Sequence, residues 1–428
     1  MNCVANRATR DRPVLVIGGG VVGVCCAYSL RLAGIPVMLA EASAVGSGAS
    51  SGNLGLLAVS HSMPLASPGV AGQALRWLLQ PNSPFAIDLP PTMNMLRWLG
   101  QFVRATYSPL LGRRAALLAS LSLESVELFQ EWSTSLGLEP RCSGTLEVFR
   151  TPQSVRKFRD QLPAMQAAGI EVELLNPAST RAFAPLLLQQ VSGGAYYPED
   201  CAVDPQAFVN AVQRELRVMG TELRDHARAQ HLRTDGATVT AVDFENETIA
   251  VAGVVLATGF EINTLIEPLG IRMPVQAARG YTLDFPPPVE WPKMPIMFAE
   301  AKLLSTPLLG RHRLGGYLHL AKTERGLPHR VTAEKLTESL SAYVPTAMVE
   351  ELRRTASPIW AGFRPCSPDG LPVIGRTAKF DNLYFATGHG MLGLTLAPVT
   401  GKRIVGLLEG SQSADEEDLL GPDRFPLS

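Results

Sequence analysis

The sequence predicts an α/β protein whose first domain is a doubly wound parallel sheet. Two continuous apolar runs, 14–17 and 36–42, flank a predicted helix at 21–34, and together they form a βαβ unit. A third apolar run at 251–259 is typical of another strand buried on both faces. Because 428 residues exceed what one hydrophobic core usually serves, we expect about two domains.

Composition excludes several classes of protein. Hydrophobic residues make up 46% and charged residues 18%, which is typical of a soluble globular protein. The net charge is −1 and no basic block is present, so nucleic acid is not the expected partner. No run of 18 apolar residues occurs, and no apolar stretch separates the arginines of residues 1–13 from the first predicted strand at 14–17. We therefore expect a cytoplasmic protein without a membrane span or a cleaved secretory signal.

The cysteines are interpreted as free thiols. None of them shows the C-x-x-C spacing of a metal site, and two lie inside the predicted helix at 21–34. The sequence therefore predicts no metal and no disulfide framework, with all six cysteines reduced in the cytoplasm, namely Cys3, Cys25, Cys26, Cys142, Cys201 and Cys366.

A glycine-rich turn joins the first strand to the first helix. Gly18-x-Gly20-x-x-Gly23 matches the dinucleotide fingerprint, in which glycines permit a tight turn, close approach to a pyrophosphate and close helix–strand packing. The N-terminus of the following helix favours phosphate. Glu41 follows Gly23 at the distance expected for an acid that binds a ribose diol. The alternative is a glycine turn without a ligand. The acid favours NAD or FAD over NADP.

Two later segments favour FAD. The strand at 251–259 ends in Ala257-Thr258-Gly259, and no second G-x-G-x-x-G is present for a separate nicotinamide cofactor. Near the C-terminus, a strand at 382–388 leads into the loop "GHGMLGLT" (388–395) and a helix at 397–410. This helix N-terminus is suited to stabilising negative charge on a reduced flavin. A plain return of the chain to the sheet is the alternative.

The order and spacing of several motifs resemble a known family. They are the fingerprint, "GSGASSGNLGLLAVSHSMPLASPG" (46–69), "VQAARGYTL" (275–283), "WAGFRPCSPDG" (360–370) and "GHGMLGLT". Over about residues 13–410 the chain resembles the FAD-dependent D-amino acid dehydrogenases of the amino-acid oxidase superfamily, which includes glycine oxidase and sarcosine oxidase. D-proline or D-hydroxyproline dehydrogenase is one candidate within it. The resemblance implies a Rossmann-like FAD-binding domain and an α+β substrate domain whose antiparallel sheet covers the flavin.

The resemblance also implies how the domains divide the chain. The FAD-binding domain is predicted to be discontinuous, over 12–95, 186–270 and 355–412. The substrate domain is predicted over 96–185 and 271–354, and a C-terminal tail over 413–428.

The fingerprint and the resemblance together assign the cofactor contacts. They fall in the first βαβ unit, the serine-rich loop, the adenine end and the C-terminal loop, and comprise Gly18, Gly20, Val21, Val22, Gly23, Glu41, Ala42, Ser47, Ser51, Asn53, Gly55, Leu56, Ala227, Ala257, Thr258, Gly259, Gly390, Met391, Gly393, Leu394 and Thr395. In sarcosine oxidases a cysteine shortly before the "SPD" stretch (367–369) carries FAD covalently. Gly362 occupies that position here, so we expect non-covalent FAD.

Arg364 is the expected substrate anchor, because the family often places in this stretch an arginine that binds the amino acid's carboxylate. A guanidinium matches a carboxylate with two parallel hydrogen bonds. Tyr281 and Tyr317 are expected to contact the substrate, and His61 and His389 to approach the flavin, without assignment of either histidine as a base. Structural roles in packing are the alternatives.

The implied reaction is oxidation of a D-amino acid. Hydride passes from Cα to flavin N5, and the imino acid is hydrolysed to a 2-oxo acid; D-proline or cis-4-hydroxy-D-proline gives a cyclic imine. Electrons then pass to quinone or another acceptor. The alternatives are a glycine- or sarcosine-type oxidase that uses O2, which "WAGFRP" and "LAPVTG" also resemble, and the flavin subunit of a larger dehydrogenase.

Residues 70–135 are helical in pattern, over 74–80, 93–105 and 115–132. Aromatic residues recur with leucines there: Trp77, Trp98, Phe102 and Tyr107. They predict either ordinary core or a patch that faces a partner subunit or the inner face of the cytoplasmic membrane.

Overall fold

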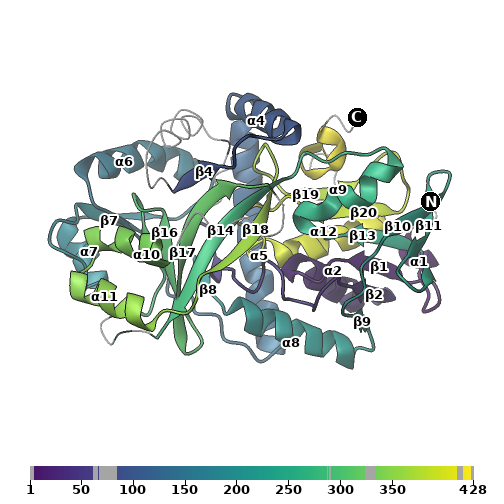
Figure 1. Cartoon of the computed structure of the whole chain (residues 1–428), viewed down its shortest axis with the longest axis horizontal. Helices are drawn as coiled ribbons and strands as arrows, with labels where there is room; N and C mark the ends of the chain where they lie inside the picture. Colours follow the sequence, from purple (N-terminus) through teal and green to yellow (C-terminus); the bar gives the residue numbers. More distant parts are fainter. Residues whose placement is uncertain are drawn as a thin grey trace.

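Two large β-sheets organise the chain in the computed structural model, which describes residues 4–60, 66, 84–286, 288, 291–322, 333–411 and 418–425. Figure 1 shows the smaller sheet toward the chain termini and the larger one beside it. This confirms the predicted α/β fold, with a Rossmann-like parallel sheet and a second, mainly antiparallel sheet.

The smaller sheet has six strands in the order β19-β20-β13-β1-β2-β9, and all of its pairs are parallel except β19–β20. Its strands are β1 (Val14–Ile17), β2 (Val37–Ala40), β9 (Glu222–Arg224), β13 (Gly253–Leu256), β19 (Val373–Arg376) and β20 (Leu383–Thr387).

Both faces of this sheet are buried, as the continuous apolar strands predict. Val14 and Val16 pack into a core shared with the helices, whereas Leu15 and Ile17 pack into a core shared with a small antiparallel sheet. The helices are α2 (Val21–Leu32), α5 (Leu111–Ser135), α8 (Pro205–Val218) and α12 (Ala397–Glu409). The small sheet comprises β10 (His231–Asp235), β11 (Thr238–Asp243) and β12 (Thr248–Ala250).

Local capping explains where these helices begin and end. Asp204 precedes α8, and its carboxylate accepts hydrogen bonds from the N–H groups of Gln206 and Ala207. Gly34 follows α2 with a φ of 74°, a left-handed conformation that glycine adopts without steric cost.

The larger sheet forms the part of the molecule that lies beside the parallel sheet. Its order is β18-β14-β17-β16-β15-β5-β7-β6, with β4 beside β17, and only β15–β5 and β4–β17 are parallel pairs. The strands are β4 (Phe85–Ile87), β5 (Thr145–Phe149), β6 (Glu173–Leu175), β7 (Gly193–Tyr197), β14 (Gln276–Phe285), β15 (Ile296–Phe298), β16 (Leu303–Leu308), β17 (Arg311–Leu320) and β18 (Trp360–Cys366). The helices α4 (Met93–Thr106), α6 (Pro152–Ala167), α7 (Pro177–Phe183), α10 (Ala333–Glu338) and α11 (Thr346–Thr355) lie around it.

Three strands of the larger sheet fall inside the ranges assigned from sequence to the FAD-binding domain. They are β4, β7 and β18. The division of the chain at the expected boundaries stays a prediction. The helices expected at 93–105 and 115–132 are α4 and α5, whereas the one expected at 74–80 lies outside the described residues. Among the described helices, none has both the length and the apolar character needed to cross a bilayer.

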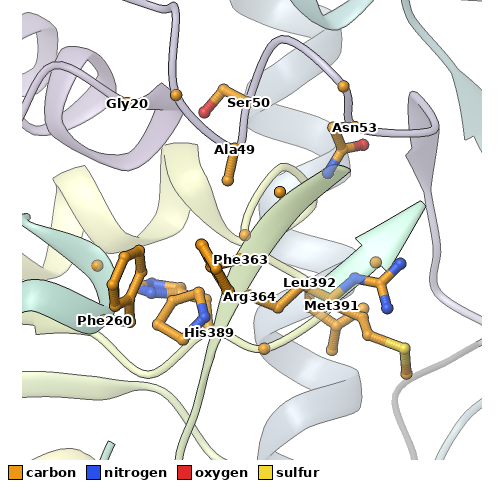
Figure 2. Close-up of a pocket in the computed structure, with 18 of the residues that line it drawn as sticks. Gly20, Ala49, Ser50, Asn53, Phe260, Phe363, Arg364, His389, Met391 and Leu392 are labelled. Carbon is orange, nitrogen blue, oxygen red and sulfur yellow. The ribbon is translucent and has the colours of Figure 1, made fainter. Parts of the chain in front are cut away.

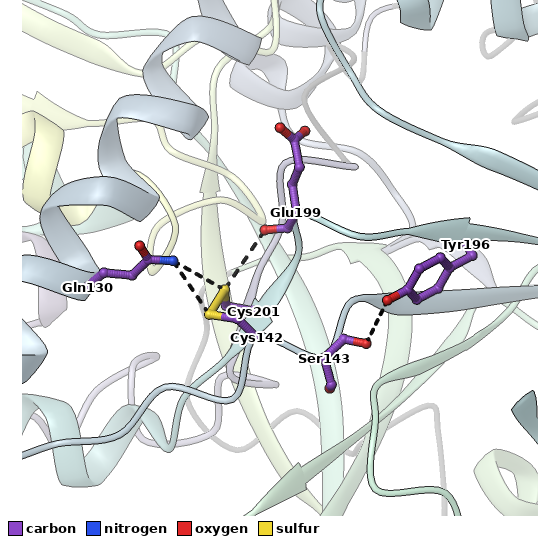
Figure 3. Close-up of a disulfide and its surroundings, with 6 residues drawn as sticks. All are labelled: Gln130, Cys142, Ser143, Tyr196, Glu199 and Cys201. Carbon is purple, nitrogen blue, oxygen red and sulfur yellow. Dashed lines mark hydrogen bonds between the residues drawn. A yellow bond between two sulfur atoms is a disulfide. The ribbon is translucent and has the colours of Figure 1, made fainter.

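The prediction of six free thiols is wrong. Cys142 and Cys201 form a disulfide, with their Cα atoms 4.1 Å apart (Figure 3). Their separation of 59 positions in the sequence conceals this proximity, which arises because Arg141 pairs in antiparallel fashion with Ala202 of the short strand β8 (Cys201–Ala202). Cys25, Cys26 and Cys366 are buried free thiols, and Cys3 lies outside the described residues. The cysteines therefore do not support a reducing compartment, and a cytoplasmic location stays a prediction.

Protein purified without reductant should expose four thiols on denaturation, because two of the six cysteines are paired. Reduction should raise the count to six and lower the free energy of unfolding by about 2–4 kcal/mol, since the bridge restrains the unfolded chain. Thiol titration and urea unfolding with and without reductant measure both quantities. Six reactive thiols in the unreduced protein contradict the pairing.

Candidate active site

A cavity of about 890 Å³ opens at the carboxyl ends of the parallel strands. Gly18, Glu41, Ala257 and Thr387, which end or follow β1, β2, β13 and β20, all line it. In an open α/β sheet this crevice is where ligands bind. The cavity continues beneath the larger sheet, where residues of β14, β17 and β18 form its other wall.

The glycine turn brings three backbone segments into contact. Gly18 has a φ of 107°, and a Cβ atom there would lie 2.4 Å from the carbonyl oxygen of Ala257. A Cβ atom on Gly23 would lie 1.8 Å from the carbonyl oxygen of Gly18. Only glycine fits at these two positions, so α2 begins directly above the ends of β1 and β13. The first N–H groups of α2 have no acceptor within the helix, and those that are not bonded to Ser50 are available to an anion.

Ser50 caps the N-terminus of α2, a role that the sequence pattern did not predict. Its hydroxyl oxygen accepts a hydrogen bond of 2.8 Å from the N–H of Val21, and its side chain lines the cavity. Figure 2 shows Ser50 close to Gly20, on the wall that also carries Asn53. The run "GSGASSGN" contains three serines, and its spacing alone does not identify which one faces the ligand.

Three residues predicted from the same loop lie outside the cavity lining. The hydroxyls of Ser47 and Ser51 donate to the carbonyl oxygens of Ala44 and Gly48, at 2.7 and 2.9 Å, so they stabilise the turn itself. Gly55, with a φ of 78°, approaches the carbonyl oxygen of Val203 instead.

Glu41 faces the cavity from the end of β2. One carboxylate oxygen accepts a 2.6 Å hydrogen bond from the N–H of Gly19, and the other accepts one of 2.9 Å from the N–H of Ser43. These contacts fix the carboxylate beside the glycine turn. Each oxygen keeps a further acceptor site, so a ribose diol can still donate to it.

Thr258 offers a second polar group near this end of the cavity. Its hydroxyl oxygen is buried and has no hydrogen-bond partner among the described residues. A buried polar atom without a partner costs about 1–3 kcal/mol, which a bound ligand can remove. The aromatic ring of Phe260 lies two residues further on and lines the same cavity.

The C-terminal loop forms the floor next to α12. The residues that the sequence assigns to this loop, Gly390, Met391, Gly393, Leu394 and Thr395, all line the cavity. The Thr395 hydroxyl accepts a hydrogen bond of 3.1 Å from the N–H of Ala58. The loop is thereby tied to the strand β3 (Leu56–Leu57), which carries the cavity residue Leu56.

His389 also lines the cavity, as a neutral ring. Its Nε2 is 2.9 Å from the hydroxyl of Thr400, and burial lowers its pKa to about 3. The imidazole is therefore uncharged at neutral pH and held in place by α12. His61, the other histidine expected near the flavin, lies outside the described residues.

Arg364 places a positive charge under the larger sheet. Its guanidinium lies against Gly280 of β14, where a Cβ atom would be only 2.5 Å from Nη2. Nη1 donates a hydrogen bond of 2.8 Å to the carbonyl oxygen of Tyr317. Among the described residues no carboxylate forms an ion pair with it, and burial lowers its pKa. A desolvated charge without a partner is unfavourable until an anion binds.

The two predicted tyrosines are placed differently from expectation. Tyr317 lines the cavity, but its hydroxyl lies 3.1 Å from that of Ser339, and its carbonyl rather than its hydroxyl contacts Arg364. Tyr281 is fully buried outside the cavity, with its hydroxyl 3.1 Å from Nδ1 of His319. Side chains alternate along a strand, and the neighbours Gly280 and Thr282 are the ones that line the cavity.

Apolar groups enclose the rest of the cavity near Arg364. Trp98 and Phe102 of α4 are stacked, with ring centroids 5.2 Å apart, and Trp98 Nε1 donates to the carbonyl oxygen of Cys366. Trp360 packs against Gly52 and Gly362, where added Cβ atoms would lie about 2 Å from its ring. The sequence pattern predicts the aromatic residues of α4 as core or as a surface patch, whereas the structure places Trp98 and Phe102 in the cavity lining.

Of the remaining predicted residues, the structure gathers the following around the same cavity: Gly20, Val21, Val22, Ala42, Asn53, Ala227 and Gly259. Gly23 lies behind the lining, in the contact with Gly18 described above.

These residues fit FAD. The glycine turn and the start of α2 suit a diphosphate, Glu41 suits the adenosine ribose, and the unpaired Thr258 hydroxyl provides a further hydrogen-bonding group. The described free cysteines, Cys25, Cys26 and Cys366, do not line the cavity, so they provide no thiol for a covalent flavin bond.

Comparison with known proteins agrees with this geometry. Residues 13–407 match the family described as "DAO: FAD dependent oxidoreductase". The fold is similar to that of glycine oxidase from Geobacillus kaustophilus (TM-score 0.76, 21% identity, covering 96% of this chain and 98% of that one). It is also similar to L-proline dehydrogenase from P. horikoshii (0.73, 19%, 97% and 98%) and to L-amino acid deaminase from Proteus vulgaris with its specific insertion deleted (0.71, 16%, 98% and 95%). The chain, with its FAD cofactor, belongs to the DAO family of FAD-dependent oxidoreductases.

Proposed function

We propose that this chain is a D-amino acid dehydrogenase that passes electrons to a quinone or another acceptor. The observation that carries the proposal is the guanidinium of Arg364, which lies in the cavity without a carboxylate partner among the described residues. An amino acid supplies the missing anion. The preference for the D configuration is supported by the sequence motifs that the chain shares with the D-amino acid dehydrogenases.

Arg364 acts on the substrate by binding and orientation. Its fork of N–H groups forms two charge-assisted hydrogen bonds to a carboxylate, and these fix the direction of the neighbouring Cα–H bond. Gly280 leaves the space in which the guanidinium lies, and the Tyr317 carbonyl holds Nη1. Tyr317 has a φ of 63°, an unusual value for a residue other than glycine, in the backbone that presents this carbonyl.

The other cavity residues control solvent and protonation. Trp98, Phe102 and Met391 form apolar surface that excludes water from the substrate. His389 is neutral and bound to Thr400, so it presents no positive charge to the substrate amine. When bound, FAD supplies the two-electron acceptor for the Cα hydride. The apolar wall favours hydrophobic or cyclic side chains, with D-proline and cis-4-hydroxy-D-proline among the candidates.

An oxidase that uses O2 is the second candidate, because "WAGFRP" and "LAPVTG" also resemble glycine oxidase. Both enzymes need the same carboxylate anchor. They differ in how the reduced cofactor is reoxidised.

Replacing Arg364 with Ala should raise KM for D-amino acids about 100-fold, because a charge-assisted bidentate contact is lost. Bound FAD, measured by visible absorbance, should stay unchanged. Arg364→Lys should recover part of the loss, since it retains the charge without the fork. An unaltered KM in Arg364→Ala contradicts the assignment.

Gly280→Ala should raise KM about tenfold without affecting FAD content, because the new methyl group displaces the guanidinium of Arg364. Gly112→Ala is the matched control, since a Cβ atom there meets nothing within 4 Å. Steady-state kinetics of both variants make the comparison. Equal KM values for the two show that Gly280 does not position Arg364.

A panel of D-amino acids, their L enantiomers, glycine and sarcosine should separate the two candidate functions. We expect turnover of D-amino acids with an artificial electron-accepting dye under nitrogen, and little hydrogen peroxide under air. Stoichiometric peroxide without dye identifies an oxidase, and turnover restricted to L-amino acids removes the proposed stereochemistry.

A further inference from the structure

The disulfide between Cys142 and Cys201 connects the surface of the molecule to its interior. Cys142 lies in the exposed segment 141–143, whereas Cys201 at the start of β8 is 2% exposed. A dissolved thiol can therefore approach the bridge from the side of Cys142. Exposed disulfides are reduced more readily than enclosed ones, and the labile ones are often regulatory or catalytic. This bridge is thus open to thiol–disulfide exchange in the folded protein.

Gln130 of α5 contacts both sulfur atoms of the bridge. Figure 3 shows its side-chain amide directed at them, with Nε2 3.6 Å from Sγ of Cys142 and 4.0 Å from Sγ of Cys201. When a thiolate attacks Cys142, the electron pair of the broken S–S bond stays on Cys201. The amide N–H is placed to donate a hydrogen bond to that sulfur as it becomes negative. A stabilised leaving thiolate accelerates exchange.

The buried end of the bridge lies one strand away from the cavity. The strand β8, which begins at Cys201, pairs in antiparallel fashion with β3. Ala202 of β8 lies opposite Leu56, which lines the cavity. The next residue, Val203, donates its N–H to the carbonyl oxygen of Gly55 at 2.8 Å. Backbone hydrogen bonds therefore connect the cysteine strand directly to the cavity wall.

Asp200, the residue before the buried cysteine, holds the continuation of β3. Its carboxylate accepts hydrogen bonds of 3.0 Å from the N–H and 2.6 Å from the hydroxyl of Ser60. Its carbonyl oxygen accepts one of 3.1 Å from the N–H of Gly144, next to the loop that carries the exposed cysteine. Segments 55–60 and 141–144 are thus both held by β8 and the residues beside it, and the bridge is the covalent link in this arrangement.

We propose that Cys142–Cys201 is a thiol–disulfide exchange site, and that its reduction by a dithiol loosens the cavity wall and weakens the binding of FAD. One thiolate of the dithiol attacks Sγ of Cys142 and forms a mixed disulfide, and Cys201 leaves as a thiolate and is protonated. The second thiol of the reductant loses its proton, attacks the reductant's own sulfur in the mixed disulfide and releases Cys142, which takes up a proton. Two electrons and two protons pass to the protein, and the dithiol becomes a disulfide.

Reduction acts on the cavity through local opening of the two short strands. The strands β3 and β8 have two residues each, and a two-stranded ribbon is at best marginally stable by itself. Without the covalent link they open more often, independently of the rest of the fold. Because FAD binds to the arrangement in which the wall is formed, its apparent Kd rises as that arrangement becomes less populated. The inference depends on the FAD site and not on the identity of the substrate.

Ultrafiltration of the FAD-loaded full-length protein at a series of dilutions gives the Kd for FAD from the fluorescence of the filtrate. Treatment with dithiothreitol should raise this Kd about tenfold, and reoxidation should restore it. Thiol titration of the same samples measures the reduced fraction of the bridge. Hydrogen exchange at the amides of Ala202 and Val203 should be faster in the reduced form, because their acceptors lie across the loosened pairing. No amino acid enters these measurements, so their outcome is independent of the proposed substrate.

The matched variant is Cys142→Ser with Cys201→Ser, which should bind FAD as the reduced wild type does and show no further response to dithiothreitol. Gln130→Leu should slow the reduction without changing the Kd of the oxidised protein, since the N–H donor is lost and the side-chain size is kept. If the double variant does not fold, the reversible change in the wild type decides. An equal Kd in the oxidised and reduced wild type overturns the proposal, as does a bridge that resists dithiothreitol in the folded protein.

Discussion

Contact between bare backbones at Gly18, Gly23 and Ala257 is the constraint on which the site depends. No side chain fits between the start of α2 and the ends of β1 and β13. The first N–H groups of the helix are therefore held at the carboxyl edge of the sheet, where Glu41 and Ser50 also converge. A larger side chain at Gly23 would separate helix and sheet, and it would move the anion-binding groups without touching the ligand.

The first half of the site could be predicted because its residues are neighbours in sequence. The fingerprint, the strand at 14–17 and the acid at Glu41 belong to one βαβ unit, so local spacing fixes their arrangement. Ser50 was missed although it lies close by in sequence. All three serines of its loop are similar in sequence context, and only the folded turn determines that Ser47 and Ser51 bond to their own backbone.

Long-range pairing explains the other departures from prediction. Cys142 and Cys201 meet because two distant strands come together, which no spacing rule reveals. Tyr281 is buried away from the cavity because its position in the alternation of β14 faces the core, and Gly280 occupies the site instead. The role of Gly280 depends on the neighbouring strand, since the absence of its side chain is what accommodates Arg364.

The two faces of α4 have different surroundings, and the inner face forms part of the cavity wall near Arg364. A desolvated guanidinium interacts strongly with a carboxylate only where water is excluded, and the inner aromatic residues of α4 exclude it. Trp98 and Phe102 lie on the face of α4 that lines the cavity, so the opposite face could carry polar residues. The outer face is apolar instead, although the stability of the cavity wall does not require it. Exposed apolar side chains of this size favour association, so the outer face of α4 is suited to a contact with something outside this chain.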